Sequence, residues 1–230
     1  MASSRHWFGI VLAYGQCMPR KPLIYTHENP YHIHARSNNK EWFYLPPSEC
    51  WPIFAAGLNH IHFEYGFTTH LFVLMDNHYH LVGTCSEKHN LGEVMSWFQK
   101  FVSRKINART GRINHIFGGR YKASLIAHPA HFAAVFKYVA RNPVRANICE
   151  RVEQYSFSSL NDMREKIVAT IPTSWAVEIP QCSSELVRWL NEPTLKEIEE
   201  IVKKGLLKTY FKPILRGSRR PALTQERYHK

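Results

Sequence analysis

The chain has 230 residues, of which 44% are hydrophobic and 13% aromatic, and its formal net charge is +12. A chain of this length and composition can bury a sizeable core, and one domain of about 150 residues with an appendage is the natural expectation. No apolar run reaches the roughly 18 residues needed to cross a bilayer, so we expect a soluble protein. The basic charge and the aromatic rings together favour a polyanion as the partner, with nucleic acid ahead of an acidic membrane surface.

The five cysteines are scattered along the chain and never form a Cys-x-x-Cys pair. Their odd number and wide spacing favour reduced thiols. The apolar run over residues 7–14 weakly resembles a signal peptide, but the run and its basic flank are both short. We therefore expect a protein of the cytoplasm.

Strand and helix signals alternate along the first two thirds of the chain. Alternating apolar residues predict strands, while apolar residues at helical spacing, bounded by Pro, Ser or Gly, predict helices. The expected elements are a strand over 30–37, a helix over 48–65, a hairpin of strands 67–75 and 78–84, a helix over 91–111, a strand over 121–127, and a helix over 129–141 that Pro143 ends. This order is typical of an α+β sandwich with an antiparallel sheet.

The composition changes after about residue 160. Two further helices are expected over 184–191 and 194–204, the second capped by Thr194 with Glu197. The stretch from Lys208 onward is rich in Lys and Arg and has a single acidic residue. We expect it to form a flexible basic tail.

Histidines two residues apart occur in three places, as His32 with His34, His60 with His62, and His78 with His80. On a strand, side chains two apart share a face and can present two imidazoles to one cation. On a helix, positions two apart point roughly 200° from each other, which excludes the pair at 60 and 62. The two strand pairs remain as competing metal sites, and a half-exposed polar strand is the alternative reading for both.

Tyr138 and Asn142 are four residues apart on the last expected helix of the domain, so they share a face. A tyrosine can attack a phosphodiester, and an Asn oxygen can complete a site for a hard cation beside two histidines. A core tyrosine and a terminal helix asparagine are the alternative reading.

Basic residues cluster between residues 96 and 145. No Asp or Glu occurs between Ser96 and Lys122. This uniform sign favours contact with phosphates over a merely solvated face. The candidates for contacts to a nucleic-acid backbone are Arg104, Lys105, Arg109, Arg120, Lys122, Arg141 and Arg145.

Five segments resemble, in order, the single-tyrosine HUH transposases, and especially the REP-associated tyrosine transposases. They are 31–39 (YHIHARSNN), 75–82 (MDNHYHLV), 119–124 (GRYKAS), 138–146 (YVARNPVRA) and 155–159 (YSFSS). The resemblance covers about residues 19–160. This chain has Asp76 where the family usually has Pro, a difference in the turn before the histidines.

The resemblance implies a ferredoxin-like domain with helices on one face of its antiparallel sheet. His78 and His80 would form the HUH pair, Asn142 would complete a site for Mg or Mn, and Tyr138 would be the nucleophile. The implied activity is cleavage and rejoining of single-stranded DNA near hairpins, through a 5′-phosphotyrosine that leaves a free 3′-OH. Such a protein would act at the nucleoid, as a monomer or a homodimer.

The resemblance and the change of composition after residue 160 together predict a division of the chain. Residues 1–18 are expected to be a dispensable extension, 19–160 the catalytic domain, and 161–230 a helical extension with a basic tail. Tyr138 must lose a proton to attack, and Lys137, Arg141 or the metal could assist.

Two other functions remain open at this stage. A binding or regulatory module on the same fold would read nucleic acid without cutting it, and it would not need Tyr138 with Asn142. A hydrolytic nuclease would share the histidine pair but would turn over through water, without a protein adduct.

Overall fold

The computed structural model of the chain describes residues 23–161 and 166–213. Residues 1–18, expected to be dispensable, and most of the expected basic tail lie outside these ranges. The main strands and helices are β1 (Tyr31–Arg36), α1 (Pro47–Tyr65), β2 (Thr68–Leu74), β3 (His78–Thr84), α2 (Leu91–Thr110), β4 (Lys122–Leu125), α3 (Pro129–Ala140), α4 (Asn142–Arg145), α5 (Ser183–Asn191) and α6 (Lys196–Gly205).

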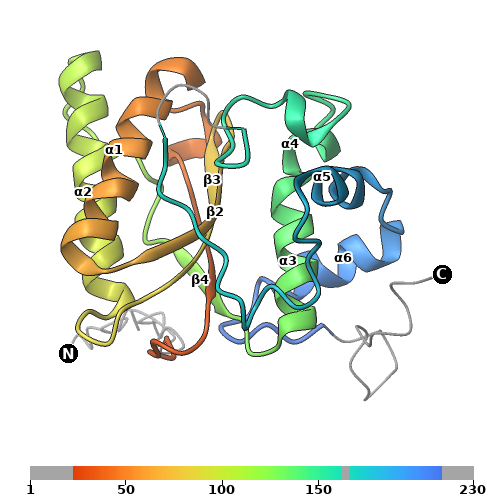
Figure 1. Cartoon of the computed structure of the whole chain (residues 1–230). Coiled ribbons are helices and arrows are strands. Elements are labelled where there is room, and N and C mark those ends of the chain that lie inside the picture. The colour runs from red at the N-terminus through yellow and green to blue at the C-terminus, as the bar shows by residue number, and fades with distance from the viewer. Residues whose placement is uncertain (1–22, 162–165, 214–230) are drawn as a thin grey trace, which may run out of the picture.

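The four strands form one sheet in the order β2-β3-β1-β4, and every neighbouring pair is antiparallel. Read along the chain, the elements from β1 to β4 follow the β-α-β-β-α-β order of a ferredoxin-like unit. The predicted fold class and element order are therefore confirmed (Figure 1).

Helices cover both faces of this sheet, which corrects the expectation of helices on one face only. Side chains alternate along a strand, and on β2 Phe72 and Leu74 belong to the core beneath α1 and α2. Leu71 and Val73 point the other way, into a second core with α3. Figure 1 shows the sheet between these two helical layers. The helix α3 follows the ferredoxin-like unit and closes its otherwise open face.

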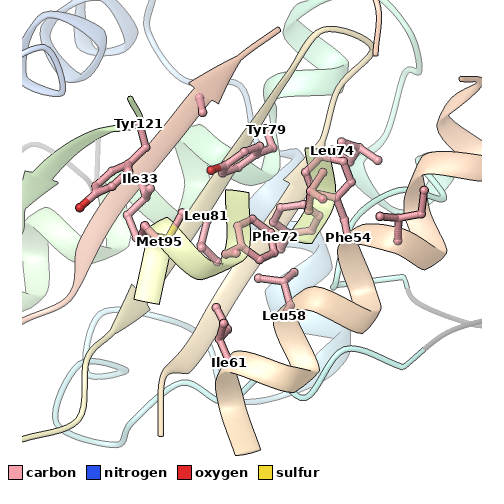
Figure 2. Close-up of a cluster of buried hydrophobic side chains, with 14 of the residues drawn as sticks. Ile33, Phe54, Leu58, Ile61, Phe72, Leu74, Tyr79, Leu81, Met95 and Tyr121 are labelled. Atoms are coloured by element: carbon pink, nitrogen blue, oxygen red, sulfur yellow. The ribbon is translucent and has the colours of Figure 1, made fainter. Parts of the chain in front are cut away.

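Aromatic rings fill the core under α1 and α2 (Figure 2). The Phe54 ring lies 5.8 Å from that of Phe72, 5.6 Å from Tyr79 and 6.0 Å from Phe98, measured between ring centroids. Gly57 lets α1 approach α2 closely, because a Cβ there would lie only 3.0 Å from the Phe98 ring. Because Tyr79 belongs to β3, this packing fixes β3 against α1 and α2.

The helix ends differ in how well the sequence predicts them. Gly66 ends α1 with a left-handed φ of 63°, as expected of a glycine there. The helix predicted over 129–141 ends at Ala140, before Pro143 as expected. Pro143 then lies in the first turn of the short helix α4, where proline is tolerated and which the sequence did not predict. The predicted cap at Thr194 is wrong, because α6 starts after Leu195 without a side-chain cap.

The extension after residue 160 closes the edges of the sheet. Ala169 forms a β-bridge with Thr69 of β2, and Tyr210 forms one with Leu125 of β4. The extension also contributes Leu190, Val202 and Phe211 to the core around α3. Covered edges leave fewer open backbone groups for pairing with other chains. Within the described ranges, no helix has both the length and the apolar character needed to cross a bilayer.

His70 links β2 to this extension by a hydrogen bond. Its Nδ1 donates to the Thr170 carbonyl, and its Nε2 lies 2.7 Å from the Thr84 hydroxyl. Burial lowers the pKa of His70 from 6.5 to about 4, although the bond to Thr170 opposes the shift. The imidazole therefore stays neutral in the folded chain at pH values where the unfolded chain protonates it.

We expect this buried histidine to make the fold sensitive to acid. A histidine whose pKa is lowered by folding contributes stability above pH 6.5 and loses it as the pH falls toward 4. At pH 5 the loss from His70 amounts to about 2 kcal/mol. Urea unfolding at pH 7.5 and pH 5 should show a larger loss for the wild type than for His70→Gln. Equal losses in the two proteins would contradict this role for His70.

Candidate active site

Both competing histidine pairs lie on the same face of the sheet. β1 and β3 are antiparallel neighbours, and His34 stands directly opposite His80. Directly opposite residues share a face, as do residues two apart, so His32 and His78 join them. This is the face that α3 covers, because Val82, two residues after His80, belongs to the core with α3. The structure therefore brings together two pairs that the sequence presented as rivals.

His80 is the centre of this group. Its ring centroid lies 5.1 Å from that of His78, 5.1 Å from that of His32 and 5.9 Å from that of His34. His80 and His32 are buried, while His34 and His78 are half-buried. The group therefore reaches from the protein interior to the surface at the ends of β1 and β3.

Asn77 fixes the orientation of His78. Its Nδ2 donates to the Lys40 carbonyl at 2.8 Å, which turns its Oδ1 toward His78. His78 Nδ1 lies 2.8 Å from that oxygen and must carry the proton, because an amide oxygen only accepts. The lone pair of His78 is thus on Nε2, free for a cation. From the sequence, Asn77 belonged only to the turn before the histidines. Its place next to His78 was the one feature that could have indicated this role.

His32 plays the same part for His80. His32 Nε2 and His80 Nδ1 are 2.8 Å apart and share one proton. When His80 donates this proton, its Nε2 keeps a free lone pair. Metal-binding histidines commonly donate their second ring nitrogen to such a partner, which fixes the tautomer and the ring orientation. This contact suits His32 to a supporting position behind His80.

Burial keeps these imidazoles neutral. It lowers the pKa of His34 and of His78 to about 4, with a smaller contribution from Arg36 in each case. Burial also lowers the pKa of His32 and of His80 well below the usual 6.5. Neutral imidazole is the form that binds metal, so the group is ready for a cation at neutral pH.

Tyr138 faces this group from α3. Its ring lies 6.4 Å from that of His80, edge to face, and is half-buried. The Arg145 guanidinium carbon lies 4.3 Å from the Tyr138 ring centroid. Arg145 Nε is in turn 3.2 Å from a carboxylate oxygen of Glu199, on α6. The tyrosine therefore lies next to both the histidine group and a cation that the extension fixes in place.

Asn142 is tied to Tyr138 through the helix backbone. Its Nδ2 donates to the Tyr138 carbonyl at 3.1 Å and also contacts the Val139 carbonyl at 3.4 Å. The amide nitrogen is thus engaged, and Oδ1 is the group left to accept or to bind a cation. This is the donor that the predicted third ligand requires.

The donor set fits a divalent cation without forming a complete cage. Within 23–161 and 166–213, no three His, Cys, Asp or Glu side chains are arranged to hold a metal. Two neutral imidazoles and one amide oxygen are still donor types that suit a borderline or hard divalent ion. Such a partial set leaves coordination positions for a phosphate oxygen and water.

Lys137 and Arg141, the two cations expected to assist Tyr138, make contacts away from the histidine group. Lys137 Nζ lies 3.9 Å from Glu192 and 5.0 Å from the Trp189 ring, and Arg141 Nη1 donates to the Leu190 carbonyl. These contacts direct both side chains to α5 and the residue after it. Arg145, one turn further along, is the cation that meets the phenol ring, and the sequence offered it only as a phosphate contact.

The predicted phosphate contacts fall into two groups. Arg104, Arg120 and Lys122 line two adjoining surface cavities, the second of which also contains His34. The others make contacts within the chain: Lys105 lies over the Phe101 ring, Arg109 donates to the Glu49 carbonyl, and Arg141 and Arg145 bind the extension.

Comparisons with known proteins find one family model and similar solved structures. Residues 47–142 match the family model described as "Transposase IS200 like", and this range contains His78, His80, Tyr138 and Asn142. A solved structure of a REP-associated tyrosine transposase bound to a REP hairpin is similar in fold, with a TM-score of 0.53 and 15% identity, covering 72% of this chain and 96% of that one.

A candidate transposase from Deinococcus radiodurans R1 matches more weakly, with a TM-score of 0.37 and 12% identity, over 56% of this chain and 90% of that one. No curated protein sequence matches the chain. The family match spans the elements from α1 to the start of α4, and the first structure shares the fold. Residues 47–142, less than half of the chain, are therefore similar to an IS200-like transposase domain.

Proposed function

We propose that the protein cleaves and rejoins single-stranded DNA with the help of a divalent metal, using Tyr138 as the nucleophile. One observation carries this proposal: the Tyr138 ring lies 6.4 Å from His80, on a sheet face where four neutral histidines gather. A module that only binds nucleic acid has no need of a tyrosine and a cation site facing each other.

His78 Nε2, His80 Nε2 and Asn142 Oδ1 would hold the cation, which we expect to be Mg or Mn. When bound, the metal would neutralise a non-bridging phosphate oxygen and stabilise the charge that develops during attack. Asn77 holds His78 with its proton on Nδ1, and His32 would do the same for His80 when His80 donates in their contact. The protein's own contribution here is to fix these donors before DNA arrives.

Tyr138 would attack the phosphorus through its phenolic oxygen. The new bond joins the phenolic oxygen to phosphorus, the bond from phosphorus to the upstream 3′ oxygen breaks, and the phenolic proton is released as that oxygen becomes a 3′-OH. The Arg145 guanidinium over the ring would favour the negative charge that grows on the phenol during this step. Because a phosphodiester is exchanged for a phosphotyrosine, the 3′-OH can reverse the reaction without ATP.

The substrate we propose is a single strand flanked by a hairpin, within the DNA of the nucleoid. The similar transposase of known structure was bound to a REP hairpin, and this chain has the same fold. The basic cavities next to His34 provide a surface for the phosphate backbone on the way to the histidines.

Product analysis tests this function. Wild-type protein with Mn²⁺ and an oligonucleotide carrying a hairpin from the DNA flanking its own gene should form an adduct that survives denaturation. A label 3′ of the cut should stay with the protein, and the released upstream strand should be extended by a DNA polymerase, since it ends in a 3′-OH. A chelator should prevent both results. Cleavage with no adduct at any time would instead indicate water as the nucleophile, and no cleavage would favour a binding module.

A further inference from the structure

A carboxylate of the C-terminal extension lies close to the candidate nucleophile. Glu199 on α6 is 3.2 Å from Arg145 Nε, and the guanidinium carbon of Arg145 is 4.3 Å from the Tyr138 ring centroid. Glu199 and Tyr138 also line the same small cavity, of about 20 Å³, between α3 and α6. Such a cavity has room for about one water molecule, so the side chains that line it are close neighbours.

Apolar packing holds α6 in this position. Ile198 and Val202, before and after Glu199, lie in the wall of the same cavity, and Val202 belongs to the core around α3. At the end of α6, Gly205 lets the Phe211 ring approach closely, because a Cβ there would lie only 2.8 Å from that ring. The backbone that carries Glu199 is therefore fixed against α3 by contacts other than the ion pair.

The ion pair matters most for Arg145, whose guanidinium is partly buried. The Arg145 side chain is 22% exposed and that of Glu199 is 20% exposed. Arg145 Nη1 is buried and has no hydrogen-bond partner among residues 23–161 and 166–213. Glu199 thus compensates a cation that has lost much of its water, and removal of one partner leaves the other charge uncompensated. Without Glu199, we expect the guanidinium to turn toward solvent and away from the Tyr138 ring.

We propose that Glu199 is a positioning residue of the active site, which holds Arg145 against the Tyr138 ring. There the guanidinium favours the negative charge that grows on the phenol oxygen during attack. The proposal rests on the proposed function, because it takes Tyr138 as the nucleophile. It gives a part in the reaction to the extension, which lies outside the residues 47–142 that match the family model.

The experiment measures the rate of adduct formation at saturating hairpin DNA and, separately, the affinity for that DNA. Glu199→Gln keeps the shape of the side chain and removes its charge. We expect the rate to fall about tenfold at unchanged affinity, because displacement of an aligned group by about 1 Å can cost about 100-fold. Glu199→Asp, which keeps the carboxylate, should recover most of the rate.

Two other glutamates of the extension provide matched controls. Glu200→Gln removes the same charge from the next residue of α6, which is exposed and paired with Lys203. Glu192→Gln removes the carboxylate that lies 3.9 Å from Lys137 Nζ, another contact between the extension and α3. Both variants should form the adduct at the wild-type rate. A tenfold fall in either of them would overturn the specific role of Glu199.

A double variant separates positioning from a purely structural role. If Glu199 acts through Arg145, Glu199→Gln should have little further effect on the rate in an Arg145→Gln background, because the two changes remove one interaction. Equal falls in rate in both backgrounds would overturn the proposal. A rate in the single variant Glu199→Gln at or above that of the wild type would overturn it as well.

A measurement without DNA distinguishes failure of this proposal from failure of the proposed function. In ¹⁵N-labelled protein, the Arg145 Nε–H signal, assigned with Arg145→Lys, should exchange with water about fivefold faster in Glu199→Gln than in the wild type or Glu200→Gln. Unchanged exchange would overturn the positioning of Arg145 even if the adduct forms. Faster exchange in Glu199→Gln, with no adduct from the wild type, would support the placement of Arg145 and overturn the proposed function.

Discussion

Tyr138→Phe is expected to abolish the protein–DNA adduct while leaving DNA binding nearly unchanged. The substitution removes only the phenolic oxygen, so the ring can keep its contacts with His80 and Arg145. Loss of a covalent nucleophile typically lowers turnover by more than about 1,000-fold. Adduct formation on a denaturing gel and anisotropy with the same oligonucleotide measure the two properties separately.

Tyr155→Phe is the matched control for this result. Tyr155 is buried, its hydroxyl donates to the Leu74 carbonyl at 2.6 Å, and it belongs to the core rather than to the histidine face. We expect this variant to be less stable but still to form the adduct. Adduct formation by Tyr138→Phe would show that another tyrosine is the nucleophile.

His80→Ala is expected to abolish both cleavage and the binding of Mn²⁺ measured by calorimetry, and His78→Ala should have the same effect. Each change removes one imidazole that the hydrogen bonds of Asn77 and His32 hold in place. His27→Ala, at an exposed histidine that lies 3.8 Å from Glu87 and is not part of the histidine group, should bind the metal like the wild type.

A smaller loss of Mn²⁺ affinity is expected when His32 is replaced. Removal of a partner behind a metal ligand typically weakens metal binding by about 10–100-fold, without removing a ligand. His32→Ala should therefore bind Mn²⁺ more weakly than the wild type but more tightly than His80→Ala. Unchanged binding in His80→Ala, with complete loss in His32→Ala, would reverse the assignment of the two pairs.

The fold was predictable because its signals are local. The alternation on strands and the apolar spacing on helices predicted every strand and main helix up to α3, and Gly66 marked the end of α1 correctly. The position of α3 was not predictable in the same way. The apolar face of α3 could pack on either side of the sheet. Phe72 and Leu74 face α1 and α2, whereas Leu71 and Val73 face α3, and this assignment of faces becomes clear only when the strand register is known.

The site was predictable only in part, because its contacts join distant segments. The spacing of His78 and His80 indicated a pair, but the place of His32 depends on the antiparallel register of β1 and β3. The contact of Arg145 with Tyr138 depends on Glu199, which lies in the extension that no motif covered. Residues that position a ligand or a nucleophile carry little local signal, because their partners are set by tertiary packing.

The central claim is that Tyr138 becomes covalently joined to DNA, and peptide mapping of the adduct tests it most directly. Trypsin cleaves after Lys137 and Arg141 and so releases residues 138–141, which contain one tyrosine. After digestion of the DNA to a short remnant, mass spectrometry should find the added nucleotide on this peptide, attached through a 5′-phosphate. A nucleotide on any other tyrosine peptide, or cleaved DNA with no modified peptide, would contradict the account.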